Sequence, residues 1–106
     1  MHSTLTVKHM EKTPQIEQYF SHLTEKLTSR LKTFNQDLID IHGMIERNLH
    51  RQEFLVIITV KLHSGRLRAQ ESNKDILSAF NSCLESLNRQ VEKIKNKLAR
   101  KNRKRI

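Results

Sequence analysis

The 106-residue sequence contains no tryptophan, one proline, two glycines and one cysteine. A lone cysteine, Cys83, cannot form an internal disulfide, so the fold needs no oxidising compartment. Because Gly43 and Gly65 are the only glycines, a glycine-rich phosphate-binding loop is excluded. No run of 18 apolar residues could span a membrane, and the first residues lack the basic and apolar regions of a signal peptide. We therefore expect a cytoplasmic protein with no membrane contact.

The side chains that usually perform chemistry are also scattered. A metal site needs three or four converging ligands, and the six histidines offer no close pair beside a carboxylate on one helix face. Asp37 and Asp40 fall on opposite faces of an expected strand, so they do not form a catalytic dyad. Cys83 falls beside an apolar stripe, which favours packing over nucleophilic chemistry. We expect a protein that is not an enzyme and has no metal, cofactor or small-molecule substrate.

Basic residues are the feature that the chain has in excess. Its 20 Lys and Arg outnumber 11 Asp and Glu, for a net charge of +9, while 36% hydrophobic residues suffice for one small core. Nine of the basic residues and only one acid, Glu92, lie within residues 86–106. A localised basic block favours a nucleic-acid partner, although a solvated tail that aids solubility is the alternative.

Hydrophobic periodicity predicts six elements. Strands are expected at residues 4–9, 37–46, 54–62 and 66–71, where apolar and polar residues alternate. A first helix begins at Thr13-Pro14, with Phe34 closing its end. A second helix follows residues 72–75, which have the spacing of a capping box, and its apolar stripe runs from Ile76 to Leu98.

The order of these elements predicts an α+β fold of type β-α-β-β-β-α. The first helix supplies the crossover that a parallel strand pair requires, and the last three strands form a meander. Because each helix has one apolar stripe, both are expected to cover the same face of a four-stranded mixed sheet. We assign residues 1–100 to a single domain and residues 101–106 to a basic, frayed C-terminal tail.

The basic residues of the two helices are segregated. At 100° per residue, the second helix carries a basic stripe opposite and beside its apolar stripe, with Glu85 and Glu92 on the other flank. Lys26 and Arg30, four residues apart, share a flank of the first helix and could line a groove with that stripe. The five aromatic residues fall on or beside apolar stripes, which disfavours base stacking and leaves recognition through phosphates and shape. The candidate RNA-binding residues are Lys26, Arg30, Arg89, Lys93, Lys97 and Arg100.

Several segments of the sequence resemble one known family. Residues 75–80 (DILSAF), 87–91 (LNRQV) and 93–97 (KIKNK) are similar to the second helix of the ribosome hibernation promoting factors, a family that includes the ribosome-associated inhibitor A proteins. Thr13-Pro14 followed by Ile16 resembles the entry to their first helix. The similarity covers residues 4–98, and the expected order of elements is also that of the family.

This resemblance implies a function. Members bind the 30S ribosomal subunit in the channel for mRNA and tRNA, contact 16S rRNA through basic helix residues, inhibit translation and preserve idle ribosomes in stationary phase or stress. The matching positions here are Lys26, Arg30, Arg89, Lys93 and Lys97. Leu77 and Ser86 depart from the family, which often has tyrosine and lysine there. The chain resembles the short form, which implies a monomer off the ribosome that does not pair ribosomes alone.

Two other functions remain open. A double-stranded RNA-binding domain has a similar helix-strand-strand-strand-helix core, but the extra first strand and the apolar start of the second helix argue against it. A protein-interaction module that modulates a transcription factor would need an exposed apolar patch. Its candidates on the outer sheet face are Leu38, Met44, Leu55 and Ile57.

Overall fold

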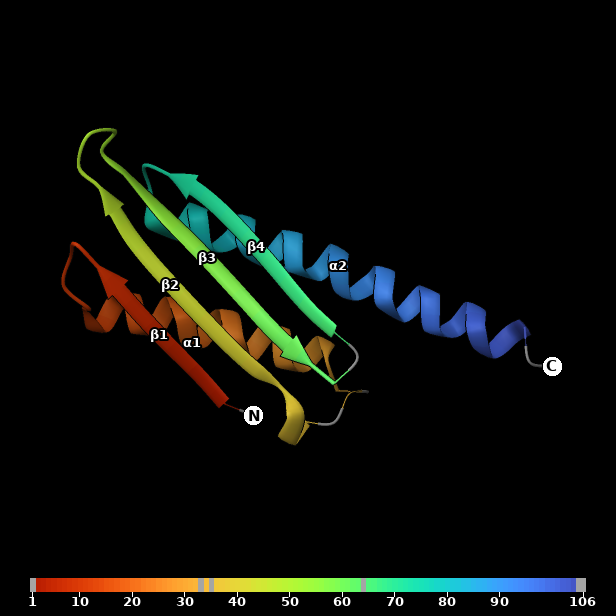
Figure 1. Ribbon diagram of the computed structural model, residues 1–106. Coiled ribbons are helices and arrows are strands. Elements are labelled where there is room, and N and C mark those ends of the chain that lie inside the picture. Colours follow the sequence, from red (N-terminus) through yellow and green to blue (C-terminus); the bar gives the residue numbers. More distant parts are fainter. Residues whose placement is uncertain (1, 33, 35, 64, 105–106) are drawn as a thin grey trace.

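The computed structural model describes residues 2–32, 34, 36–63 and 65–104, with side chains through residue 97, that of residue 36 excepted. The elements follow in the order β1 (His2–Lys8), α1 (Pro14–Arg30), a short 3-10 helix η1 (Gln36–Leu38), β2 (Asp40–Asn48), β3 (Glu53–Leu62), β4 (Gly65–Asn73) and α2 (Ile76–Lys104). Figure 1 shows a twisted sheet with both helices on one side of it. The predicted fold class and the placement of both helices are confirmed.

The four strands lie in the sheet in the order of the chain. β1 pairs with β2 in parallel, from His2 opposite Asp40 to Lys8 opposite Glu46. β2 with β3 and β3 with β4 pair antiparallel, as expected of a meander. The parallel pair requires a crossover, and α1 supplies it across the same sheet face that α2 covers (Figure 1).

The core lies between that sheet face and the two helices. Alternate residues of β2, β3 and β4 point inward and are buried, while their neighbours point to the uncovered outer face. The largest fully buried side chains come from both layers: Leu27, Leu31, Ile39, Ile41, Ile45, Val56, Ile58, Val60, Phe80, Leu87 and Val91. The apolar stripes read from the sequence therefore are the faces that pack together.

The first helix begins as the sequence predicts. Thr13 is the N-cap, with its hydroxyl oxygen accepting a hydrogen bond from the Ile16 amide at 3.3 Å, and Pro14 occupies the first turn, where no amide hydrogen is needed. The helix ends earlier than expected, at Arg30 instead of near Phe34. The amide of Leu31 closes the last turn onto the Leu27 and Thr28 carbonyls, and Phe34 packs half-buried against the core beyond it.

Two local predictions are wrong. Residues 37–39 were expected to open the second strand, but Gln36–Leu38 form a 3-10 turn and β2 begins at Asp40. The only apolar residues here are Leu38 and Ile39, and two adjacent residues are too few for an alternating pattern that would distinguish a strand from a turn. Ser72 does not cap the second helix, because β4 continues through Asn73 and α2 begins at Ile76. Asp75 precedes the helix instead, and its carboxylate accepts a hydrogen bond from the Ser78 hydroxyl at 2.8 Å.

Gly43 permits the close approach of α1 to the sheet. A Cβ atom at this position would lie 2.6 Å from Cε1 of Phe20 and 3.2 Å from Cδ1 of Leu5. Phe20 is buried, so its ring has little room to move away. Glycine at this position of β2 is therefore required by packing against the helix.

One residue on each outer edge of the sheet has its backbone hydrogen-bonded by a side chain. At the β4 edge, the amide of Gln90 on α2 accepts from the Arg68 backbone N–H at 3.2 Å and donates to the Arg68 carbonyl at 2.9 Å. At the β1 edge, Lys12 Nζ donates to the Leu5 carbonyl at 3.1 Å. That carbonyl points away from β2, because the His2 amide bonds to Ile39 and the direction alternates along the strand. Within the described chain, no helix is long and apolar enough to cross a membrane.

Candidate nucleic-acid interface

Three of the predicted RNA-binding residues lie along one solvent-exposed flank of α2. Arg89, Lys93 and Lys97 are all exposed and follow one another at intervals of four residues, which places them about 6 Å apart along the helix axis. Lys97 lies seven residues after Gln90, which contacts β4, so both point to the same side of the helix. We call Arg89, Lys93 and Lys97 the α2 basic row.

The α2 basic row makes no direct ion pair among the described side chains, although Glu85 and Glu92 lie within one turn of Arg89 on the same helix. Among the residues whose side chains the structure describes, none forms an ion pair with Arg89, Lys93 or Lys97. Three exposed cations at one-turn intervals repel one another unless anions lie nearby. The row is therefore suited to a linear polyanion, such as the phosphate backbone of a nucleic acid. Arg100, the sixth predicted residue, lies within α2, but its side chain is outside the described part of the chain.

The two residues predicted on α1 face the other flank of α2. Arg30 Nη1 lies 3.7 Å from Glu92 Oε1, and both side chains are about half exposed. On the helical wheel Glu92 is about 60° from Arg89 and about 140° from Lys97. The expectation that the α1 residues and the α2 basic row share one groove is therefore wrong, because the acidic flank of α2 is the one that faces α1.

Lys26 lies in a groove of its own between the two helices. This groove has a volume of about 500 Å³ and is lined by Gln18, Tyr19, His22, Leu23, Lys26, Leu77, Phe80, Asn81 and Leu84. Tyr19 packs against Phe80 with ring centroids 6.1 Å apart, so the floor of the groove is aromatic. Lys26 and His22 leave its rim polar and basic, which is a surface that RNA can approach.

Leu77 and Ser86, the two departures from the family pattern, have distinct places. Leu77 is 39% exposed on the wall of the groove, where a tyrosine would add a polar group. Ser86 is half-buried, and its hydroxyl oxygen accepts a hydrogen bond from Gln90 Nε2 at 3.2 Å. Ser86 thus orients the amide that pairs with the β4 edge.

The outer sheet face carries a small apolar patch. Met44 and Ile57 are neighbours on β2 and β3, Leu55 lies two residues from Ile57, and all three are half-buried. Leu38 does not join them, because it belongs to the 3-10 turn before β2. Polar residues border the patch, with Thr6 beside Met44 and Gln70 beside Ile57. The patch is too interrupted to favour a protein-interaction module.

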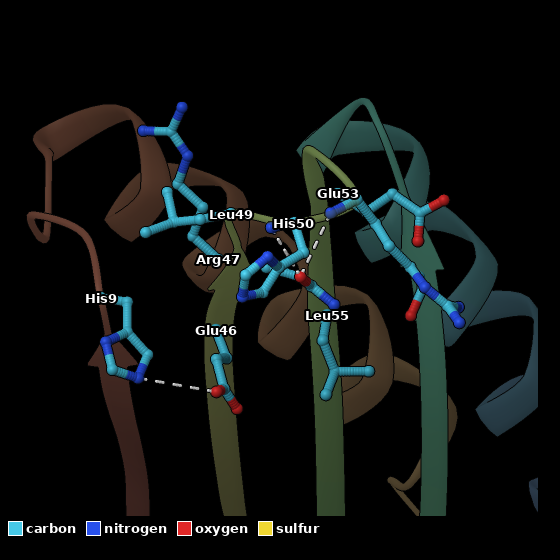
Figure 2. A pocket seen from close by; sticks show the side chains of 10 residues that line it. His9, Glu46, Arg47, Leu49, His50, Glu53 and Leu55 are labelled. Atoms are coloured by element: carbon cyan, nitrogen blue, oxygen red, sulfur yellow. Dashed lines mark hydrogen bonds and ion pairs between the residues drawn. The ribbon is translucent and has the colours of Figure 1, made fainter.

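A hollow at the β2–β3 hairpin has the mixed charge of an ordinary surface. Figure 2 shows His9, just after β1, pointing toward Glu46 on β2, and Nε2 and Oε1 of this pair are 3.7 Å apart. The Asn48 side-chain oxygen accepts from the backbone amides of His50 and Arg51, which fixes the turn. Because Glu46 and Glu53 lie among the basic residues, the hollow is a weaker candidate for phosphate than the α2 basic row.

Cys83 is packed in the core. Its side chain is fully buried, and Sγ donates to the Val56 carbonyl at 3.5 Å. Burial, with the nearby negative charge of Glu71, raises the pKa of the Cys83 thiol to about 12. A thiol with that pKa is a poor nucleophile at neutral pH, which agrees with a packing role. Within the described residues, no three His, Cys, Asp or Glu side chains gather as a metal site.

Comparison with known proteins decides the family. The model of the family described as sigma 54 modulation protein / S30EA ribosomal protein matches residues 4–99. The chain belongs to this family. Its members are ribosome-associated modulation proteins, so the resemblance read from the helix sequences is confirmed.

Solved structures with the same fold include two of this kind. A ribosomal subunit interface protein from Coxiella burnetii is 25% identical, with a TM-score of 0.67, and the alignment covers 91% of this chain and 99% of that one. The N-terminal domain of Protein Y from Thermus thermophilus is 21% identical with a TM-score of 0.69, covering 89% and 99%. The second comparison supports the fold alone.

Proposed function

We propose that this member of the S30EA ribosomal protein family binds the 30S subunit at 16S rRNA in the mRNA and tRNA channel. Binding there inhibits translation and stabilises idle ribosomes during stationary phase or stress. The protein acts in the cytoplasm as a binding protein without catalysis. The observation that carries the proposal is the α2 basic row, three exposed cations that form no direct ion pair with any described acidic side chain.

The roles of the six candidate residues differ in this proposal. Arg89, Lys93 and Lys97 contact consecutive phosphates, since a helix spaces them about 6 Å apart. Lys26 contacts RNA from the groove between the helices, and Arg30 does so after exchanging Glu92 for a phosphate. That exchange costs little, because an ion pair with both partners half exposed is worth about 0–1 kcal/mol. Arg100 extends the row by one turn along the helix.

The first test is co-sedimentation with 30S subunits over a range of salt concentrations. Phosphate contacts release counterions, so the association constant should fall steeply as salt rises. The variant R89E/K93E/K97E should lose binding at every salt concentration. Loss of binding should also remove inhibition in a cell-free translation assay.

The matched control is R47E/R51E/K74E, which makes the same change in net charge near the β2–β3 hairpin. These three residues are exposed and lie away from the α2 basic row. The control should bind like the parent protein. If the parent protein does not sediment with 30S subunits at low salt, the proposed function is wrong. If both variants bind equally, the assignment to α2 is wrong.

A further inference from the structure

The β4 edge carries a second set of cations beside the α2 basic row. Arg66 and Arg68 alternate with the buried Leu67 and Ala69, so their side chains point to the outer sheet face. Lys61 on β3 pairs directly with Arg66 and is also exposed. We call Lys61, Arg66 and Arg68 the β4-edge cations.

The hydrogen bonds of Gln90 bring the two sets of cations together. They join α2 to the backbone of Arg68, and Cys83 contacts Val56, which pairs with Glu71. Cys83 therefore lies near Glu71 and Gln90 near Arg68, so α2 and β4 run in opposite directions. Lys93 and Lys97, further along the helix, therefore approach the end of β4 that holds Arg66. Figure 1 shows α2 running beside β4 in the opposite direction and continuing beyond it.

Lys61 and Arg66 are like charges directly opposite each other on β3 and β4. Like charges directly opposite each other on neighbouring strands lower stability. Asp40, on the other side of Lys61, is the nearest acid in the register, yet neither Lys61 nor Arg66 forms an ion pair with any residue that the structure describes. The guanidinium group of Arg68 donates a hydrogen bond to the neutral Gln70 amide oxygen, at 3.2 Å. An external anion would relieve this repulsion.

We propose that the RNA-binding surface continues from the α2 basic row over the β4 edge, where Lys61, Arg66 and Arg68 contact further phosphates of the same RNA. The inference rests on the proposed function and adds a second face of the molecule to it. Arg66 and Arg68 are about 7 Å apart along the strand, which is similar to the spacing within the α2 basic row. Both sets of cations therefore match the spacing of phosphates along one strand of RNA. An RNA segment that straddles this edge would contact both rows.

The test compares R66Q/R68Q with R47Q/R51Q for binding to 30S subunits in a salt series. Both variants remove two exposed arginines, but the second pair lies at the β2–β3 hairpin, near the end of β4 opposite to Arg66 and Arg68. The slope of log K against log salt should become shallower by about 1–2 for R66Q/R68Q, since each phosphate contact contributes about 0.7–0.9. The slope for R47Q/R51Q should match that of the parent protein.

Thermal unfolding distinguishes a role of Arg66 in RNA binding from a role in stabilising the fold. Replacing Arg66 removes its repulsion with Lys61, so R66Q should unfold at the same or a higher temperature while binding 30S subunits more weakly. Equal slopes for R66Q/R68Q and the parent protein, or equal losses in both double variants, would overturn the inference and leave the α2 basic row intact. A parent protein that does not bind 30S subunits would overturn the proposed function itself.

Discussion

The two faces of the sheet differ although the same four strands supply both. On the inner face, Gly43, Ile58 and Ala69 lie side by side on β2, β3 and β4, and all three are buried under the helices. On the outer face, Met44, Ile57 and Gln70 lie side by side on the same three strands, and they are partly or fully exposed. Each residue is one position from its counterpart, so the alternation of the strand decides its surroundings. The inner face is constrained by packing, whereas the outer face is free to carry charge.

The largest expected effect comes from truncating one isoleucine on each face. Ile58→Ala should lower the free energy of unfolding by about 2–5 kcal/mol, because it leaves a cavity under the helices. Ile57→Ala on the half-buried outer face should cost about 1 kcal/mol, within the range of strand propensities. Urea denaturation followed by circular dichroism measures both. Equal losses would contradict the assignment of the two faces.

Adding one methyl group to the inner face should have the next largest effect. Gly43→Ala should lower the free energy of unfolding by about 1–3 kcal/mol, since the new Cβ would overlap the Phe20 ring. The double variant G43A/F20L removes the ring and provides the control. Its loss should be smaller than the sum of the two single losses. Additive losses would show that Phe20 is not the cause.

A smaller effect concerns pH and the thiol on the inner side of α2. In the unfolded chain the Cys83 thiol ionises near its ordinary pKa of 9.0, whereas the folded thiol has a pKa of about 12. Above pH 9 the unfolded state therefore loses its proton first. The stability contributed by the thiol is fully present below pH 9 and is lost as pH rises toward 12. From pH 8 to pH 10 the advantage of the parent protein over Cys83→Ala should shrink by roughly 1 kcal/mol.

Urea denaturation of both proteins at several pH values measures this difference and cancels the titration of lysine and tyrosine. A difference that stays constant up to pH 11 would mean that Cys83 is accessible to solvent. The exposed contact between His9 and Glu46, on the other side of the sheet, offers a contrast. Its removal should change stability by less than about 1 kcal/mol.

Local sequence signals predicted the features that depend on neighbouring residues. The alternation of apolar and polar residues along 54–62 identified the inner face of β3, and Thr13-Pro14 identified the start of α1. Both signals depend only on residues that are close in sequence. The helical wheel also separated Glu92 from the α2 basic row. Which flank of α2 faces α1 could not be read in the same way. It depends on how the second helix packs on the sheet, which no single element encodes.

Contacts between distant residues were missed for the same reason. Arg30 meets Glu92 and Gln90 meets Arg68 across long separations in sequence, and neither pair has a spacing that singles it out. Gly43 was noted only as one of two glycines, since its need for a small residue comes from Phe20 on another element. The β4-edge cations were read as ordinary strand residues because their register with α2 was not known.

The side chains at the two sheet edges also affect how copies of the protein meet. An edge strand with free backbone groups can add a strand from another molecule and so begin aggregation. Here Gln90 fills such a position on β4, and Lys12 fills one on β1. A second copy would have to displace these side chains and bring its own basic residues close. At one position on each edge, the protein itself therefore opposes the addition of a strand from another copy.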